Sequence, residues 1–442
     1  MISKLQRLLL LVKDRRAHPG LRGIMDEMRT NDALSPCELE EVKRGLLKDS
    51  LTRAMECPYY SRAFRTHRVD AQSPDSLQNF PPLQRSTTQE HREEFLHPEV
   101  DPSRLLKKTT SGSTGTKASF YRSRSGLDWG YATGERSKEY WGLDRTARYG
   151  RVWGRSFKFK SRVRDRLRGY AALAKDRSIG VYNIDASALS VEYLEELWDQ
   201  LVRWKPARLH GYAAGIYLIA KFVNEAGLPG RNLKLDSAIL ESEQCFDFQK
   251  EEIRRAFGCP VLEWYGCVEV GVIATPCRNG RLHIREDHVH LEVVDGKILL
   301  TTLREPAMPL IRYEVGDEAE ISEKPCSCGL PSRTFAELRG RSPDQLRRLD
   351  GSFFPGHMLT HAFDQFPRIR RFQLIQKTED LVKVLVEVNE TLTGQERSRL
   401  IESLQKLFGG AIVVDLEECT EIPTQESGKF RWVISELSGG GL

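Results

Sequence analysis

The spacing of hydrophobic and polar positions predicts alternating helices and strands in the middle of the chain. Apolar positions recur with helical spacing over 126–142, 190–204, 213–226 and 246–257. Short apolar runs lie between these segments: GVYNI, ARLHGY, LDSAILES and PVLEWYG. This alternation is typical of a largely parallel sheet that is covered by helices.

Helical spacing also covers residues 38–65, where Pro58 is a predicted break. The N-terminal segment MISKLQRLLLLVKDRR is predicted to form a short amphipathic helix. Its apolar run, Leu8 to Val12, has five residues, whereas a secretory signal needs roughly 7–15. No segment approaches the ~18 apolar residues of a membrane span. We therefore expect a cytoplasmic protein without a transmembrane segment.

Beyond residue 281 the apolar runs become short and closely spaced, as in RLHI, VHLEVV, KILLTTL and PLIRYE. They predict an antiparallel or barrel-like β section, with a boundary near GRSPDQL (340–346). After it come alternating valines from Val382 to Val388, a helical stripe from Leu400 to Phe408, and the strand AIVVDL. The predicted fold class is α/β, with parallel-sheet layers and a barrel-like section over 1–340, a hinge over 341–344, and a small α+β domain over 345–442.

Composition and charge fit an ordinary soluble globular protein. The 442 residues suffice for two or three domains, and 40% are hydrophobic and 29% charged. A net charge of +5 is too small to indicate a dedicated nucleic-acid-binding protein. The densest basic run has eight Lys or Arg residues between 151 and 168. It is either a solvated helix face or a wall that attracts a nucleotide, CoA or an acidic acceptor.

The stretch TTSGSTGTK (109–117) offers no apolar side chain to a core. Its backbone N–H and hydroxyl groups can instead surround an anion, and Gly112 and Gly115 permit close approach. The segment is not a Walker loop, because its glycines are three apart and Ala118 stands where the Mg²⁺-binding hydroxyl should be. A plain surface turn is the alternative.

Four later segments give this loop a context. EWYGCVEVG (263–271) carries Glu269, PLIRYEVGDEAEI (309–321) is predicted to end a strand in Gly316-Asp317, RGRS (339–342) precedes the boundary, and TQESGKFRW (424–432) carries Lys429. In this order the five segments resemble the adenylate-forming superfamily, and most closely its phenylacetate-CoA ligase branch with the capsule-biosynthesis relatives. FYRS, WGL…RVWGR and the short chain support that branch. The resemblance covers roughly residues 80–435.

The resemblance implies an ATP site whose phosphates are held by the loop and a metal. Lys117 would add positive charge to the β- and γ-phosphates, and Glu269 would bind Mg²⁺. Lys429 would reach the α-phosphate and the substrate carboxylate. The loop residues that would hold the phosphates are Thr110, Ser111, Gly112, Ser113, Thr114, Gly115 and Thr116.

The remaining roles concern the nucleoside. Asp317 would accept hydrogen bonds from the ribose hydroxyls, with Arg341 nearby. The segment Glu241, Ser242 and Glu243 would pack on adenine, with Tyr265 and Gly266 beside it. The alternatives are that Glu269 is a surface carboxylate and that Asp317 only caps a turn.

Such a site suits one kind of chemistry. A carboxylate is a poor nucleophile, and charge accumulates on the α-phosphate, so positioning and cations suffice and no protein nucleophile is needed. The resemblance implies a ligase that forms an acyl-adenylate and pyrophosphate from a small carboxylate, then transfers the acyl group to CoA or to an amine or thiol acceptor. LHGYAAG (209–215) is predicted to line the carboxylate pocket, with His210 as a structural histidine.

Other functions stay open at this point. They are a nucleotidyl transferase, an amide ligase that does not use CoA, and a non-catalytic, zinc-braced protein that binds nucleic acid or polysaccharide. Intact Glu269, Asp317 and Lys429 argue against the last. The acceptor is unidentified, and a homodimer is an open alternative.

Two further features bear on metal and movement. Cys277, His283, Cys326 and Cys328 suit a tetrahedral structural Zn²⁺, as in relatives of this branch, and the alternative is buried thiols. At the hinge, Pro343 stands where many members of the superfamily have an acidic residue or lysine. Proline fixes φ, so either Asp344 is the pivot or the domain swing is reduced, which bears on CoA thioester formation and not on adenylation.

Overall fold

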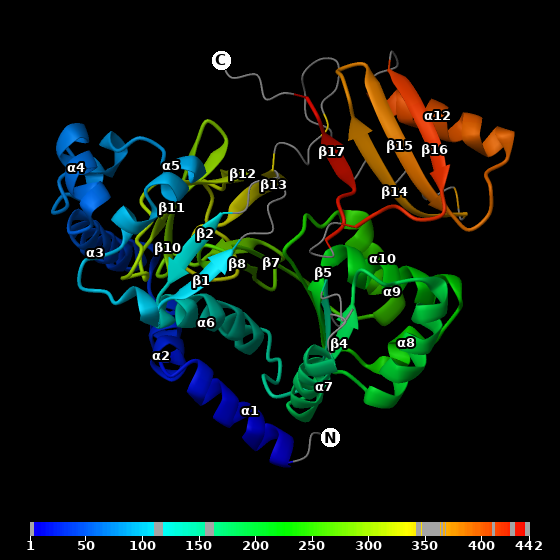
Figure 1. Cartoon of the computed structure of the whole chain (residues 1–442), viewed down its shortest axis with the longest axis horizontal. Coiled ribbons are helices and arrows are strands. Elements are labelled where there is room, and N and C mark those ends of the chain that lie inside the picture. The colour runs from blue at the N-terminus through cyan, green and yellow to red at the C-terminus, as the bar shows by residue number, and fades with distance from the viewer. Residues whose placement is uncertain are drawn as a thin grey trace. The chain divides into compact units, whose positions relative to one another are not determined.

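The computed structural model describes residues 4–109, 118–154, 163–341, 368–408, 412–424 and 429–437, and the single residues 346, 363 and 366 (Figure 1). Contacts divide the chain into two compact units. Unit one comprises 1–149, 170–182 and 262–338, and unit two comprises 150–169, 183–261 and 339–442. The domain boundary expected at 341–344 stays a prediction, since Pro343 and Asp344 lie outside the described residues.

Unit one begins with helices. These are α1 (Lys4–Ala17), α2 (Leu21–Asp32), α3 (Pro36–Met55), α4 (Pro58–His67), η1 (Pro74–Asn79), α5 (Arg85–Glu90), η2 (Arg92–Phe95) and η3 (Pro102–Arg104). The break predicted at Pro58 is confirmed, because Pro58 is the first residue of α4, where its missing N–H costs no helical hydrogen bond. In α1, the apolar side chains of Leu8, Leu9, Leu11 and Val12 are exposed. Among the described residues, no helix combines the length and apolar character that a membrane crossing requires.

In unit one, neighbouring strands beyond residue 281 pair antiparallel, as predicted for that section, and so do two earlier pairs, β1 (Leu106–Thr109) with β2 (Ser119–Arg122) and β7 (Val261–Cys267) with β8 (Gly271–Pro276). β1 and β2 form a hairpin. β7, β8 and β9 (Leu282–Ile284) follow one another in antiparallel pairs, and α6 (Arg124–Tyr140) packs along β8. A four-stranded sheet has the order β10 (Val289–Val294), β11 (Lys297–Thr302), β12 (Tyr313–Ile321) and β13 (Phe335–Arg341).

One strand end was predicted wrongly. β12 starts at Tyr313 and continues to Ile321, so Gly316 and Asp317 lie inside the strand and not at its end. Arg312, the residue directly before β12, has a φ of +49°, so the backbone there is not in the strand conformation. Pairing with β11 shifts between Lys297↔Glu318 and Leu299↔Glu314. Gly316, with φ +90°, lies in this bulge, which allows the strand to resume beyond it.

The main core of unit one joins the helices to these strands. It includes aromatic side chains that are almost completely buried: Tyr60, Phe64, Phe80, Phe95, Phe120 and Tyr313. Edge-to-face contacts connect several of them, including Tyr60 with Phe95 and Phe120 with Tyr313. This core supports both the β1–β2 hairpin and the start of β12.

Unit two contains the alternating pattern predicted for the middle of the chain. Its strands follow the order β4 (Val181–Asp185), β3 (Tyr149–Trp153), β5 (Arg208–Tyr212) and β6 (Ser237–Glu241), and β5 pairs with β6 in parallel. Its helices are α8 (Val191–Trp204), α9 (Ala213–Glu225), η4 (Gly230–Leu233) and α10 (Asp247–Phe257), while α7 (Val163–Ser178) begins in unit two and continues into unit one at residue 170. A side chain at Gly211, whose φ is +149°, would place Cβ 1.9 Å from the Val152 carbonyl oxygen. Glycine is therefore needed where β3 passes β5.

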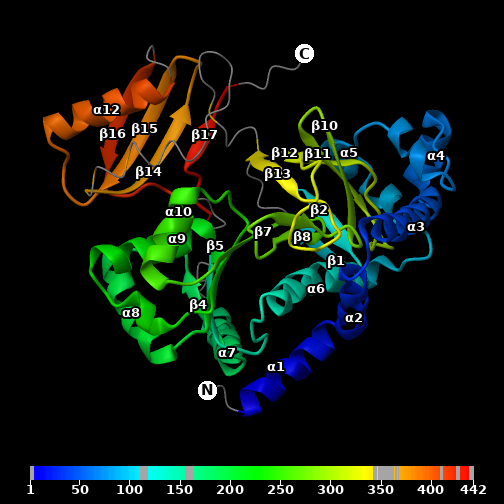
Figure 2. The same cartoon turned by 180° about the vertical axis from the view of Figure 1, so that it is seen from behind.

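The C-terminal part is the predicted α+β fold. Its sheet has the order β16 (Val413–Cys419), β15 (Leu381–Val388), β14 (Ile369–Gln376) and β17 (Val433–Ser435). Val382, Val384 and Val386 are fully buried on one face of β15, as their alternation predicted. Figure 2 shows α12 (Gly394–Phe408) lying along this sheet. Leu400, Leu404 and Phe408 form the buried face of α12.

Candidate functional site

The β1–β2 hairpin brackets the Ser/Thr/Gly loop. Residues 110–117, including Lys117, lie outside the described residues, but the hairpin on either side is described. Thr109 pairs with Ser119 at the end of the hairpin that the loop connects, and their hydroxyl oxygens are 3.0 Å apart. The Gln89 carboxamide oxygen accepts from the Ser119 N–H at 2.7 Å. Gln89 therefore holds the base of the loop, a role that its position in the sequence did not reveal.

Glu269 lies just after β7 and is only 3% exposed, so the alternative of a surface carboxylate is wrong. Its Oε1 accepts a hydrogen bond from the Tyr313 hydroxyl at 2.9 Å and lies 3.4 Å from Arg85 Nη2. Arg85 Nε also donates to the Tyr313 hydroxyl at 3.3 Å. Burial, together with the neighbouring Glu269, raises the pKa of Tyr313, so the phenol keeps its proton and donates. Arg85 and Tyr313 were not predicted as site residues.

Asp317 and Tyr265 meet across unit one. The Tyr265 hydroxyl donates to Asp317 Oδ2 at 2.9 Å, and the Tyr265 ring packs edge-on against Phe335. Burial raises the pKa of Tyr265 well above its usual value, which keeps the hydroxyl protonated. Gly266 is exposed next to it. A side chain there would place Cβ 2.3 Å from the Gly271 carbonyl oxygen.

In unit two, the structure brings together the segment after β6 and Lys429. Lys429 Nζ donates to the Ser242 carbonyl oxygen at 2.8 Å, and Ser242 has a positive φ of 71°. The ammonium also lies 5.7 Å from the centre of the Tyr212 ring. Glu241 Oε1 is 3.2 Å from His210 Nε2, an ion-pair distance that agrees with a structural role for His210. Arg341, the last residue of β13, is half-buried in unit two.

Glu243 forms hydrogen bonds both with Phe430, the residue after Lys429, and with the start of α9. Its Oε1 accepts from the Phe430 N–H and its Oε2 from the Ala214 N–H, each at 2.9 Å. Burial raises the pKa of Glu243 to about 7, against the opposing effects of these two N–H groups and of Lys429. Two N–H donors on two oxygens favour the ionised form, so this contact depends on charge in the neutral pH range.

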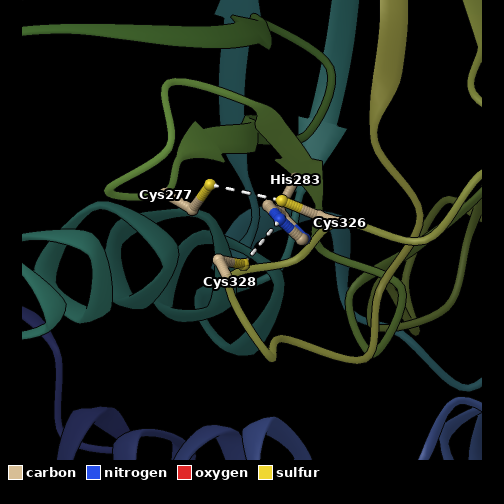
Figure 3. Close-up of side chains that lie close together, drawn as sticks. All are labelled: Cys277, His283, Cys326 and Cys328. Carbon is tan, nitrogen blue, oxygen red and sulfur yellow. Dashed lines mark hydrogen bonds between the residues drawn. The ribbon is translucent and has the colours of Figure 1, made fainter.

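Cys277, His283, Cys326 and Cys328 form a compact cluster (Figure 3). Their ligand atoms lie within 4.8 Å of one another. Cys277 Sγ is 3.7 Å from Cys326 Sγ, and Cys328 Sγ is 3.2 Å from His283 Nε2. Zinc–sulfur bonds of about 2.3 Å in a tetrahedron place sulfur ligands roughly 3.8 Å apart. The cluster has the donor set and the spacing that Zn²⁺ requires.

The surroundings of the cluster also fit a metal. His283 Nδ1 lies 3.0 Å from the Ser332 carbonyl oxygen, so Nδ1 carries the proton and Nε2 is free to face the thiols. The Leu330 N–H lies 3.5 Å from Cys328 Sγ. Cys277 is buried, whereas Cys326 and Cys328 are half-exposed, which does not match the alternative of thiols that only fill a core. Four protein ligands leave no open position for catalysis.

Part of the basic run lies outside the described residues, namely 155–162. The choice between a solvated helix face and an anion-attracting wall therefore stays a prediction.

Comparisons with known proteins give matches to CapK and to phenylacetate-coenzyme A ligases. A family model of the CapK C-terminal domain matches residues 346–436. Protein CapK of Staphylococcus aureus is 24% identical over 351 residues, which cover 76% of this chain and 75% of that protein. The phenylacetate-coenzyme A ligase of Thermus thermophilus is 25% identical over 254 residues, covering 49% of this chain and 57% of the ligase. The chain thus spans little more than half the length of that ligase.

Among solved structures, 2-hydroxyisobutyryl-CoA ligase in its postadenylation state has the same fold. The TM-score is 0.72 at 18% identity, and the match covers 92% of this chain and 91% of the other. The predicted fold class is confirmed by this similarity.

Proposed function

Since the chain belongs to the adenylate-forming superfamily, in the branch of CapK and the phenylacetate-CoA ligases, and is a ligase, we propose that it activates a carboxylate as an acyl-adenylate. A carboxylate oxygen attacks the α-phosphorus of ATP. The bond between the α-phosphorus and the bridging oxygen breaks, and pyrophosphate leaves. The observation that carries the proposal is the contact of Lys429 with Ser242 and of its neighbour Phe430 with Glu243, which joins two motifs that lie far apart in the chain.

The residues have complementary roles in this proposal. Lys429 neutralises charge on the α-phosphate and the attacking carboxylate, and the segment Glu241–Glu243 lies against the adenine. Asp317, oriented by the Tyr265 hydroxyl, accepts from the ribose hydroxyls, with Arg341 nearby. The loop 110–117, with Lys117, surrounds the β- and γ-phosphates.

Glu269 is the residue that would hold Mg²⁺. Its buried carboxylate has a hydrogen-bonded Tyr313 and a neighbouring Arg85, so its position is set before the nucleotide arrives. The metal supplies positive charge to the phosphates when it is bound. Arg85, at 3.4 Å, must share Glu269 with that cation, which favours a weakly held, exchangeable metal.

A second step would transfer the acyl group from AMP to an acceptor. We propose CoA or an amine or thiol, with release of AMP, and a small domain over 345–442 that turns on the 341–344 hinge. The comparisons leave the acceptor open. The Cys277, His283, Cys326 and Cys328 cluster would hold one structural Zn²⁺ that braces β8 and β9 against the segment around Ser332.

Carboxylate-dependent exchange of labelled pyrophosphate into ATP tests the first step. The assay covers a panel of aryl, acyl and amino acids, with the wild-type chain, Lys429→Ala and the control Lys377→Ala, whose lysine pairs with Glu436 on the surface. We expect exchange with at least one acid in the wild type and the control, and loss in Lys429→Ala. Pyrophosphate exchange that persists in Lys429→Ala would show that Lys429 is not needed for adenylation. ATP binding without exchange for any acid would favour a nucleotidyl transferase or the non-catalytic alternative.

A further inference from the structure

We propose that Arg122 is a positioning residue that fixes the backbone of the Glu269 loop, residues 268–270, to the hairpin that carries the phosphate loop. Arg122 is the last residue of β2 and the arginine of the FYRS segment, to which the proposed function gives no role. The inference rests on that proposed function, because it concerns how Glu269 is placed to hold Mg²⁺ beside the phosphates of ATP.

The guanidinium of Arg122 contacts the backbone on both sides of Glu269. The side chain is only 2% exposed. Nη1 donates to the Val268 carbonyl oxygen at 3.4 Å, and Nη2 donates to the Val270 carbonyl oxygen at 3.3 Å. Nη2 also donates to the Gly126 carbonyl oxygen at 2.8 Å. A planar fork with several fixed donors can hold these acceptors together, whereas the single ammonium of lysine cannot.

Glu305 locks the orientation of this fork. Its Oε2 accepts from Arg122 Nε at 2.9 Å. Its Oε1 accepts from the N–H groups of Ser123 and Ala307, at 3.0 and 3.2 Å. The buried charge of Arg122 is thus paired, and both carboxylate oxygens have partners.

Two glycines in α6 make room for this arrangement. A side chain at Gly126 would place Cβ 2.1 Å from Glu305 Oε2, and one at Gly130 would place it 2.4 Å from the Val270 carbonyl oxygen. The Val270 carbonyl oxygen also lies 3.2 Å from His288 Nε2. The backbone around Glu269 is therefore held by side chains from two directions and closely approached by a helix.

The consequence concerns the metal and not the nucleoside. Tyr313 and Arg85 orient the Glu269 carboxylate, while Arg122 holds the backbone that carries it. Arg122 also pairs with Leu106 at the open end of the β1–β2 hairpin, and the opposite end of the same two strands flanks the phosphate loop. Loss of the fork should shift Glu269 relative to the β1–β2 hairpin and weaken only the part of ATP binding that depends on Mg²⁺.

The test measures ATP affinity of the full chain by calorimetry, once in excess Mg²⁺ and once in EDTA. The gain from Mg²⁺, the ratio of the two dissociation constants, should fall about 10- to 100-fold in Arg122→Lys, as for other residues that orient metal ligands. Affinity in EDTA should stay within about twofold. Arg124→Lys is the matched control, since Arg124 lies two residues from Arg122 and donates to the Ala17 carbonyl oxygen at an exposed site.

Glu305→Gln separates positioning from stability. It removes the charge of the partner, but the amide oxygen can still accept from Arg122 Nε and the fork keeps its three backbone carbonyl acceptors. The melting temperature should therefore fall while the gain from Mg²⁺ persists. If Arg122→Lys does not fold, the double variant Arg122→Met/Glu305→Met, which has no buried lone charge, takes its place with the same expected loss.

An unchanged gain from Mg²⁺ in the Arg122 variant overturns the inference, and so does equal weakening in Mg²⁺ and EDTA. The inference is also overturned if the gain in ATP affinity from Mg²⁺ falls in proportion to the melting temperature in both Arg122→Lys and Glu305→Gln. A wild-type chain that binds ATP, but no better with Mg²⁺, removes the role of Glu269 and the inference with it. A wild-type chain that does not bind ATP refutes the proposed function itself, a result distinct from the others.

Discussion

Glu269 and Lys429 are held in opposite ways. Glu269 is almost completely buried, and Tyr313, Arg85 and the backbone contacts of Arg122 fix it within unit one. Lys429 is half-buried, and its ammonium donates to the Ser242 backbone carbonyl oxygen. Glu269 is therefore held in a fixed position within unit one, whereas a small movement would break the hydrogen bond of Lys429 to Ser242. The proposed two-step reaction would need this difference, because the proposed metal site would serve in both steps whereas Lys429 would serve only in adenylation.

The largest expected effect on activity comes from replacing Lys429, the more weakly held of the two residues. Lys429→Ala should lower pyrophosphate exchange by about 100- to 1,000-fold, the usual result of removing a preorganised charge from a transition state. The melting temperature should stay within about 2 °C, because the contacts of a half-exposed lysine, such as the hydrogen bond to the Ser242 carbonyl oxygen, contribute little to folding. A large loss of stability would mean that Lys429 is structural and would reverse the comparison.

The next largest effect is expected from replacing Glu269, the buried residue of the comparison. Glu269→Gln should lower exchange about 10- to 100-fold and raise the Mg²⁺ concentration needed for half-maximal rate, because an amide is a weaker ligand than a carboxylate. Tyr313→Phe, which keeps Glu269 and removes its hydrogen bond, should cost less. Equal effects of the two variants would show that the hydrogen bond, and not the carboxylate, matters.

Glu243 sharpens the comparison through pH. Glu243→Gln should lower exchange about 10-fold, because an amide can accept from only one of the two N–H groups at Ala214 and Phe430. In the wild type the rate should rise as the pH passes about 7, the pKa of the buried carboxyl. The variant should lack this rise. A pH profile shared by both would exclude Glu243 as the titrating group.

The same pKa has an opposite consequence for stability. The pKa of Glu243 in the folded chain, about 7, is above its ordinary value of 4.5, so protonation favours folding. This contribution is complete below about pH 4.5 and is lost as the pH rises through about 7. Thermal unfolding of wild type and Glu243→Gln across that range measures it as a difference that grows towards acid pH.

The smallest expected effect on rate concerns the zinc cluster, which lies on neither side of the comparison. Purified protein should contain about one zinc per chain, and Cys326→Ser should lose it and unfold several degrees lower. Exchange at 25 °C should change little, because the closed site has no open position. Cys37→Ser is the control, since Cys37 is exposed and apart from the cluster. A stable, active protein without zinc would contradict the proposed metal.

Periodicity predicted most helices and strands because it reports burial along one element at a time. Pro58 and the alternating valines of β15 are examples in which local chemistry decides the structure. The strand end at Gly316-Asp317 was predicted wrongly, because the bulge that lets β12 continue depends on pairing with β11. Local pattern does not contain that information.

Some residues of the candidate site could likewise be predicted from the sequence, and others could not. Motif residues such as Glu269 and Lys429 could be named from the sequence, and Cys277, His283, Cys326 and Cys328 do lie together. Arg85 and Gln89 could not be named, because their partners Glu269 and Ser119 are 184 and 30 residues away. Arginine and glutamine in a polar connection carry no signal of their own until the fold places a carboxylate or a loop beside them.

The most direct test of adenylation follows an oxygen atom. The acid that supports the fastest exchange is labelled with ¹⁸O in its carboxylate and incubated with ATP, Mg²⁺ and hydroxylamine, which captures the acyl group without the natural acceptor. If the carboxylate attacks the α-phosphorus, hydroxamate forms and AMP carries one ¹⁸O atom. Unlabelled AMP, or ADP with ¹⁸O in phosphate, would contradict an acyl-adenylate and with it the proposed function.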